Sequence, residues 1–547
     1  MKVCPAPIAA VTLVVSLLSV AAEPQEKKQE QKKLNPQELK RMAADGDRLM
    51  AEGKMADARR HFLTVLEQEP ANVPVALKLG RTCESIQDWD GAIAAYQKVA
   101  ASAQGPERAE GLAGLAGAYV RTRQFKEAAD SARKAIELNP AAAPAHVSLA
   151  YSLVRLGSTE QALPAARKAI ELAPTSAVAH AALGEALLRD NKVADAEAAF
   201  RKALELDPKA ADALAGLADL QCRKADYSAA EASAAKALEL DPNQARAYSV
   251  RGRVNLARGQ LIPAQGDLTT AIARDSTDVE AQLALAQIQR KQNNLTSAVT
   301  SYRRVLSLDP SRGPAYLELG EILVSQGDLT AARDPLEKAA ERMPDSGRAQ
   351  YLLGVVYEQG KDLERALQAY SRAAELDPNL AEAHHGRGRL LRELKKDAPG
   401  ALASLEKAAA LSPDNGDVLT DFGVALYDAK QVDKAGDALS RAVKTADYRN
   451  PLGFGVYGLV LKDKQNFTEA AGWFEKAAAG SPKWWIPHWG AAWSYFGLIK
   501  KGCPCGPEDE ERVKKIKEHF DQMIALQGKD PALEQRVDAL TKGQKVK

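Results

Sequence analysis

The sequence is poor in cysteine and in aromatic residues, and it carries almost no net charge. Only 5 of its 547 residues are Cys, 5% are aromatic, and 74 basic residues stand against 72 acidic ones. So few cysteines exclude a scaffold held together by disulfides. The charge balance gives no general attraction for nucleic acid or anionic lipid. Beyond residue 20 the chain also lacks an apolar run long enough to cross a membrane.

The one long apolar run, at the N-terminus, has the pattern of a secretory signal over residues 1–22. A single positive charge precedes an uncharged stretch from Ile8 to Val20, and the small residues of SVAAEP follow. Cleavage after Ala21 or Ala22 would export the chain to the periplasm or the medium. An uncleaved inner-membrane anchor is the alternative, and after cleavage we expect no transmembrane segment.

A repeat of 34 residues fills most of the chain. Segments such as KAIELNP, KAIELAP, KALELDP, RVLSLDP and RAAELDP recur at this interval. Their prolines are Pro140, Pro174, Pro208, Pro242, Pro310, Pro344 and Pro378. Each period holds two apolar patterns of helical spacing joined by a short turn, and the proline ends the second one. We therefore predict an all-α chain of helix pairs.

Glycine recurs on the inner face of the first helix of the pair, where it lets the two helices approach closely. It is found at Gly184, Gly252, Gly320, Gly354, Gly388 and Gly423. This Leu-Gly, Ala, Phe and Pro pattern resembles the tetratricopeptide repeat. The resemblance covers residues 39–484 in thirteen units and implies a right-handed α-solenoid with a concave groove lined by first helices. Residues 23–38 would then be a charged linker, and 485–547 a degenerate repeat with capping helices.

Two units are one residue longer than the period. They span residues 381–415 and 416–450. We expect the extra residues in loops, at KKDAPG (395–400) and TADYRNP (445–451).

Motifs for catalysis are missing from the sequence. It has no Gly-rich phosphate loop, no HExxH and no GxSxG. We therefore expect a protein that is not an enzyme and that holds no cofactor or metal. Four histidines share one slot near the start of a first helix and are interpreted as packing residues; they are His146, His180, His384 and His488.

The pair Cys503-Pro-Cys505 is the exception. It could form a structural bridge or stay as two thiols, carry out thiol–disulfide exchange, or supply two of the four ligands of a zinc site. Thiol–disulfide exchange is the alternative function that this pair offers.

In the resembled family one stripe of the first helix faces the partner. Carried onto this chain, the stripe contains Arg121, Tyr151, Arg155, Arg189, Arg223, Arg253, Arg290, Tyr351, Arg389, Arg392 and Tyr427. Four of these arginines, from Arg121 to Arg223, recur every 34 residues and should form a ladder. Forked guanidinium groups suit recognition of carboxylates. The resemblance thus implies a protein or peptide ligand.

Aromatic residues gather near the C-terminus. Trp485, Trp489, Trp493 and Phe496 fall on one stripe of a predicted first helix whose partner helix spans 510–526. Either the tail (residues 528–547) folds back and covers this stripe as a cap, or the stripe is a landing surface for an extended peptide or a polysaccharide.

The sequence as a whole predicts an exported, non-catalytic scaffold that binds a protein or peptide in its groove. A nucleic-acid-binding solenoid is a second rival, because helical repeats can read RNA bases one by one. The near-zero net charge and the export signal oppose it.

Overall fold

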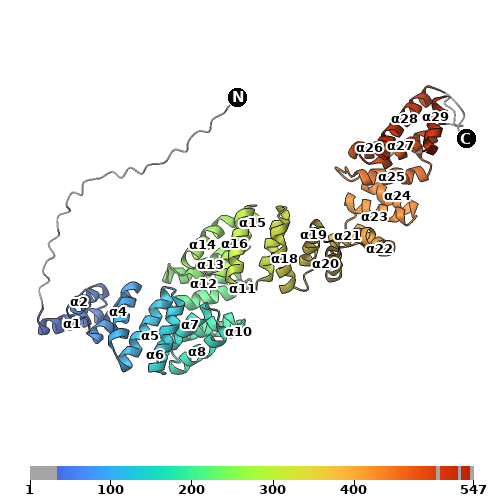
Figure 1. Cartoon of the computed structure of the whole chain (residues 1–547). Coiled ribbons are helices and arrows are strands. Elements are labelled where there is room, and N and C mark those ends of the chain that lie inside the picture. The colour runs from blue at the N-terminus through green and yellow to red at the C-terminus, as the bar shows by residue number, and fades with distance from the viewer. Residues whose placement is uncertain (1–33, 500–505, 528–530, 543–547) are drawn as a thin grey trace, which may run out of the picture. The chain divides into compact units, whose positions relative to one another are not determined.

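The computed structural model describes residues 34–499, 506–527 and 531–542. Within these residues every regular element is a helix, and within each of two compact units successive helices pack side by side (Figure 1). The all-α fold predicted from the repeat is confirmed. The chain divides into two compact units, Met1–Gln244 and Ala245–Lys547.

The first unit consists of helix pairs with short connections. Its helices are α1 (Pro36–Ala51), α2 (Met55–Gln68), α3 (Val73–Ser85), α4 (Trp89–Ser102), α5 (Gly105–Arg121), α6 (Phe125–Leu138), α7 (Ala143–Arg155), α8 (Thr159–Leu172), α9 (Ala177–Arg189), α10 (Val193–Leu206), α11 (Ala211–Arg223) and α12 (Tyr227–Leu240). Helix α1 begins inside the predicted linker, because Asn35 caps it. The Asn35 side chain accepts hydrogen bonds from the backbone N–H groups of Gln37 and Glu38, and the Glu38 carboxylate accepts one from Asn35 N–H.

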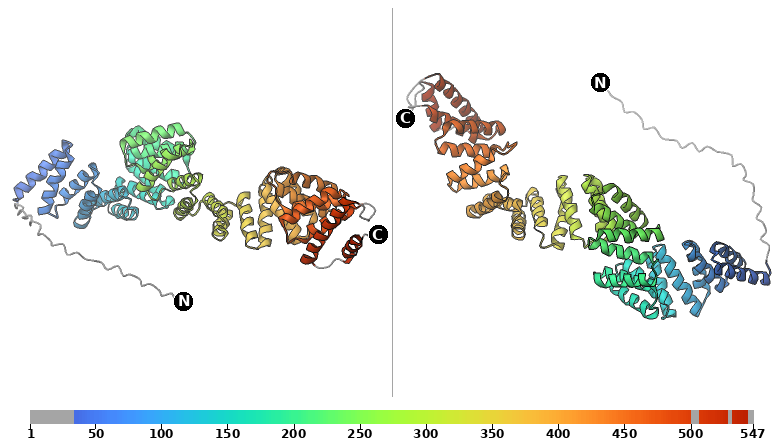
Figure 2. Two further views of the ribbon diagram at one scale, coloured as in Figure 1. Left: turned by 90° about the horizontal axis from the view of Figure 1, so that it is seen from above. Right: turned by 180° about the vertical axis from the view of Figure 1, so that it is seen from behind.

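The second unit continues the same pairing (Figure 2). Its helices are α13 (Ala245–Ala257), α14 (Leu261–Arg274), α15 (Val279–Lys291), α16 (Leu295–Leu308), α17 (Gly313–Ser325), α18 (Leu329–Arg342), α19 (Gly347–Gln359), α20 (Leu363–Leu376), α21 (Ala381–Leu390), η1 (Leu391–Lys395), α22 (Ala398–Leu411), α23 (Gly416–Asp428), α24 (Val432–Ala442), α25 (Pro451–Asp463), α26 (Phe467–Gly480), α27 (Trp485–Leu498), α28 (Pro507–Gln527) and α29 (Pro531–Thr541). Helices α27 and α28 pack against each other, as the sequence predicted for the aromatic helix and its partner.

The helix ends follow from local sequence. Within a pair, the turn contains a residue with positive φ, such as Gly157 (φ 79°) or Asn191 (φ 58°). Glycine and asparagine tolerate this conformation best. At the end of a pair, Asp207 leaves the helical region with φ −141° and ψ 98°, because the following proline, Pro208, disfavours helical geometry before it.

The core of a repeat is a large side chain held between glycines. Phe200 of α10 is fully buried. A Cβ atom built at Gly184 on α9 would lie 2.7 Å from the Phe200 ring, and one built at Gly216 on α11 would lie 2.4 Å from it. The glycines therefore make room for a ring that joins one repeat to the next, which is how these units share a core.

The two longer repeats absorb their extra residue differently. In the first, the extra residue enters the helix itself, because α21 ends in the π-helical turn η1, Leu391–Lys395. A one-residue insertion within a helix typically produces such a turn. The expectation of a loop insertion was wrong there. In the second, α24 ends at Ala442 and the extra residue lies in the connection to α25, as expected.

Candidate functional site

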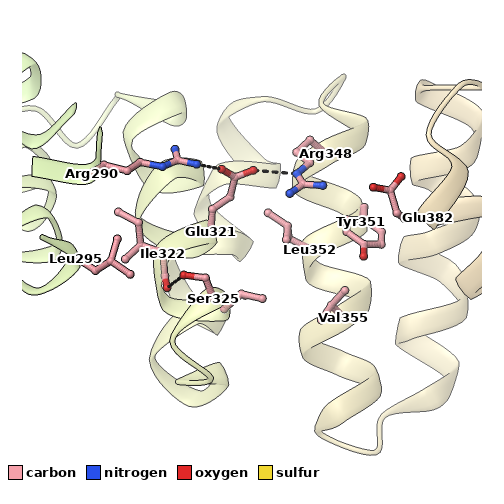
Figure 3. A pocket seen from close by; sticks show the side chains of 11 residues that line it. Arg290, Leu295, Glu321, Ile322, Ser325, Arg348, Tyr351, Leu352, Val355 and Glu382 are labelled. Carbon is pink, nitrogen blue, oxygen red and sulfur yellow. Dashed lines mark hydrogen bonds and ion pairs between the residues drawn. The ribbon is translucent and has the colours of Figure 1, made fainter. Parts of the chain in front are cut away.

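A pocket opens along the first helices of the second unit. It has a volume of about 410 Å³ and is formed by α15, α17, α19 and α21, with Leu295 of α16 at one side (Figure 3). Its lining residues are Arg290, Leu295, Glu321, Ile322, Val324, Ser325, Arg348, Tyr351, Leu352, Val355 and Glu382. Because equivalent faces of successive first helices line it, the pocket lies on the stripe from which the family resemblance implied ligand binding.

A chain of ion pairs crosses one wall of the pocket. Glu321 accepts hydrogen bonds from Arg290 Nη2 (2.8 Å) and from Arg348 Nε (2.8 Å). Arg290 also forms an ion pair with Glu318. Burial by itself would raise the pKa of Glu321, but the hydrogen bonds from Arg348 and Arg290 outweigh it and lower that pKa. This wall links three successive repeats and presents cations that are already paired.

Tyr351 forms the centre of the pocket between that wall and α21. Its ring lies 5.9 Å from the ring of Tyr370, and the Arg348 guanidinium lies 5.4 Å from its centroid. Burial and then the negative charge of Glu382 raise the pKa of Tyr351. The neighbouring lining residues Leu352 and Val355 give this side an apolar floor on which a ligand side chain could pack.

Two of the residues predicted from the sequence, Arg290 and Tyr351, meet in this pocket. The other nine lining residues, among them Glu321, Val355 and Glu382, were not predicted. A usable signal was present: Glu321 and Val355 precede the predicted residue Arg389 at intervals of 34. Choosing stripe residues by side-chain type, arginine or tyrosine, hid these positions.

The predicted arginine stripe is extensively paired within the chain. In the first unit Arg121 bonds Asp212 at 3.4 Å and lies 6.0 Å from the ring of Trp89, and Arg223 Nε bonds Asp219 at 3.1 Å. In the second unit Arg389 bonds Glu358 at 2.5 Å. Others that interact within the chain are Tyr151, Arg155, Arg189, Arg253, Arg392 and Tyr427. A ligand carboxylate would therefore have to compete with carboxylates that the repeats themselves supply.

The spacing of the repeat explains two of these ion pairs. Arg290 and Glu321 lie 31 residues apart, and so do Arg389 and Glu358. An interval of 31 residues is three short of the 34-residue period. It therefore places the carboxylate on the adjacent first helix, almost one helical turn from the position equivalent to that of the arginine. Such pairs connect neighbouring repeats.

The aromatic stripe near the C-terminus is partly covered. Trp485, Trp489, Trp493 and Phe496 pack against a buried cluster that includes Ile516 and Phe520 of α28. From α29, the Arg536 guanidinium lies 4.6 Å from the Trp493 ring and 5.4 Å from the Phe496 ring. Lys462 of α25 lies 5.5 Å from the Trp489 ring. The tail thus contacts the end of the stripe, while the tryptophan side chains keep partial exposure.

The histidines of the shared slot hydrogen-bond a proline carbonyl of the preceding turn. The ring Nε2 lies 3.0 Å from the Pro140 carbonyl in His146, 2.9 Å from Pro174 in His180, and 3.1 Å from Pro378 in His384. This contact satisfies a backbone acceptor at the junction of two repeats. These histidines are therefore structural, and the described residues contain no cluster of metal-ligating side chains.

The fourth histidine, His488, forms a pair with His519 of α28. Their Nδ1 atoms are 3.1 Å apart, so one ring must donate and the other accept. Glu475 of α26 lies 3.8 Å from His519 Nε2 and bonds Lys515, and the ring of Tyr495 stacks on His519. Burial lowers the pKa of both histidines, and the charge of His488 lowers that of His519 further.

We expect acid to loosen this junction. Because both pKa values lie below the ordinary 6.5, the unfolded chain binds more protons than the folded chain near that pH. The contribution of the neutral histidine pair to the free energy of unfolding is therefore complete above pH 6.5. It falls as the pH drops below 6.5, by up to about 1.4 kcal/mol per pH unit for each histidine. Denaturation at several pH values should show that His519→Gln reduces this acid sensitivity. An unchanged pH dependence would contradict it.

Cys83 and Cys222 are buried and form no disulfide with each other. Cys503 and Cys505 lie outside the residues that the structure describes, as does the predicted signal. No helix in the described ranges is both long and apolar enough to span a bilayer.

Comparison with known proteins agrees with the repeat. One family model described as a tetratricopeptide repeat matches residues 113–177, 251–313 and 317–381, and a second with the same description matches 49–116, 187–254 and 394–448. The chain belongs to the tetratricopeptide-repeat family. It is a protein-interaction scaffold of the kind that binds protein or peptide partners.

Several solved structures are similar to parts of the chain. YrrB, described as a TPR protein with an unusual peptide-binding site, is 25% identical over 34% of this chain and 97% of its own, with a TM-score of 0.31. Cut9–Hcn1 of the APC/C is 15% identical over 86% and 97%, with a TM-score of 0.39. PilF of Pseudomonas aeruginosa is 22% identical over 39% and 97%, with a TM-score of 0.35. None of the curated proteins matches the chain.

Proposed function

We propose that this protein is an exported, non-catalytic scaffold that binds an extended segment of a partner protein in the pocket of its second unit. The observation that carries the proposal is the pocket itself. It combines an apolar floor around Tyr351 and Val355 with ordered charges on its wall, and equivalent faces of successive first helices line it. An extended peptide crossing those helices would meet the same kind of surface at each repeat.

Export rests on the N-terminal pattern of residues 1–22, and a bacterial cell envelope is the setting that we propose. The internal pairing of the arginines supports a scaffold rather than a surface for nucleic acid, because paired guanidinium groups do not supply the excess positive charge that binds phosphates.

A bulky side chain in the pocket tests this function. Val355 is half-buried at the pocket floor, so Val355→Trp should fill the space. We expect this substitution to reduce the amount of partner that the tagged full-length protein captures from native extract by about tenfold or more. A tenfold loss of affinity corresponds to about 1.4 kcal/mol of binding free energy.

The matched control adds the same side chain elsewhere. Ile262 is 84% exposed on α14, a second helix, so Ile262→Trp should leave capture unchanged. A partner captured equally by wild type and both variants would contradict binding in this pocket.

A further inference from the structure

The pocket contains one carboxylate without a cation. Arg290 is occupied by Glu318 and Glu321, and Arg348 by Glu321. Glu382 lines the same pocket and is exposed, and within the described parts of the chain it has no ion pair or hydrogen bond.

The position of Glu382 matters because of what surrounds it. Figure 3 shows it on α21, on the opposite side of Tyr351 from Glu321. The next arginine along the groove, Arg389, is held by Glu358 at 2.5 Å. Arg348 and Arg389 are thus both paired with other carboxylates. The unpaired charge that this end of the pocket offers to a ligand is therefore the negative charge of Glu382.

The floor of the pocket is apolar. Ile322 and Val324 of α17 and Leu352 and Val355 of α19 contribute to it, and Leu295 closes one side. A pocket of about 410 Å³ with these walls accommodates a branched or aromatic side chain. An apolar floor and a separate unpaired carboxylate thus lie within one site.

We propose that the pocket recognises an extended protein segment in which an apolar side chain lies next to a lysine or arginine. The apolar side chain packs on Val355 and Tyr351, and the cation pairs with Glu382. This inference rests on the proposed function and specifies its ligand. It reverses the expectation from the sequence, in which arginines bind ligand carboxylates, because the arginines at this pocket, Arg290, Arg348 and Arg389, already have carboxylate partners in the chain.

A random dodecapeptide library displayed on phage supplies the probe. Selection on the full-length protein should enrich peptides with an apolar residue beside Lys or Arg. Synthetic copies of these peptides should bind Glu382→Gln about fivefold more weakly than wild type at low salt, as expected for a partly exposed ion pair. Glu406→Gln is the matched control, because Glu406 is exposed on the second helix α22, outside the pocket.

The outcomes separate this inference from the function on which it rests. Enriched peptides that lose affinity for Val355→Trp, but carry no basic residue or bind Glu382→Gln as tightly as wild type, would overturn the basic-ligand inference and leave the groove function intact. Peptides that still bind Val355→Trp at full affinity would place binding elsewhere and overturn both. A selection that enriches no peptide would also overturn both.

Discussion

Gly354→Leu is expected to destabilise the second unit by about 1–3 kcal/mol or more, the usual cost of overpacking a core. Gly354 lies on α19 against Tyr370 of α20, and a Cβ atom there would come within 2.5 Å of the Tyr370 ring. The other edge of the ring lies against the α21 backbone at Gly386, so close that a Cβ atom built there would be 2.8 Å from it, and this leaves the ring little room to move. Since repeats transmit stability to their neighbours, the loss should reach adjoining units. Urea denaturation would measure it.

A second glycine provides the control. Gly266 is exposed on α14 with no atom within 4 Å of a built Cβ, so Gly266→Leu should be neutral or slightly stabilising through helix propensity. Equal stabilities of the two variants would show that the glycines do not set the distance between helices.

Phe200→Ala is expected to cost the first unit about 3–5 kcal/mol, which is typical of removing a buried aromatic ring. Phe200 is fully buried, and its ring occupies the space left by Gly184 and Gly216. The same ring belongs to the contact between one repeat and the next, so the change should weaken both a helix pair and its junction. Phe200→Leu, which keeps most of the volume, should cost less than about 1.5 kcal/mol. Denaturant titration followed by helical circular dichroism measures both, and a loss below 1 kcal/mol for Phe200→Ala would contradict this packing.

The sequence predicted the packing within the repeats well because the same residue pattern occurs in many of them. Gly184 and Phe200 take their positions from a 34-residue pattern, so each repeat supports the interpretation of the others. The start of α1 was harder to predict. The capping residue Asn35 lies at the edge of a highly charged segment, where composition suggested a linker and concealed a single local signal.

The pocket was only partly predictable. Arg290 and Tyr351 stand out by residue type, and the register alone would have added Glu321 and Val355. What the sequence could not show is which charges pair with which. Glu318, Glu321 and Glu382 are all near the groove arginines in sequence register. Glu318 pairs with Arg290 and Glu321 pairs with both Arg290 and Arg348, whereas Glu382 pairs with neither. That choice depends on side-chain positions in three dimensions.

The aromatic end shows the same limit. Sequence periodicity placed Trp489 and Trp493 on one stripe but left open whether the tail or a ligand covers it. The contact of Arg536 with Trp493 comes from α29, the second helix after α27 in the chain, and no periodic pattern relates the two residues.

Site-specific photo-crosslinking tests the central claim most directly. A benzophenone amino acid placed at position 355 lies in the pocket, and the same group at position 262 lies on an exposed face of α14. In the full-length protein exposed to native extract, we predict a discrete crosslinked partner from position 355 and none from position 262. Crosslinking of the same partner from position 262 alone would contradict binding in the groove of the second unit.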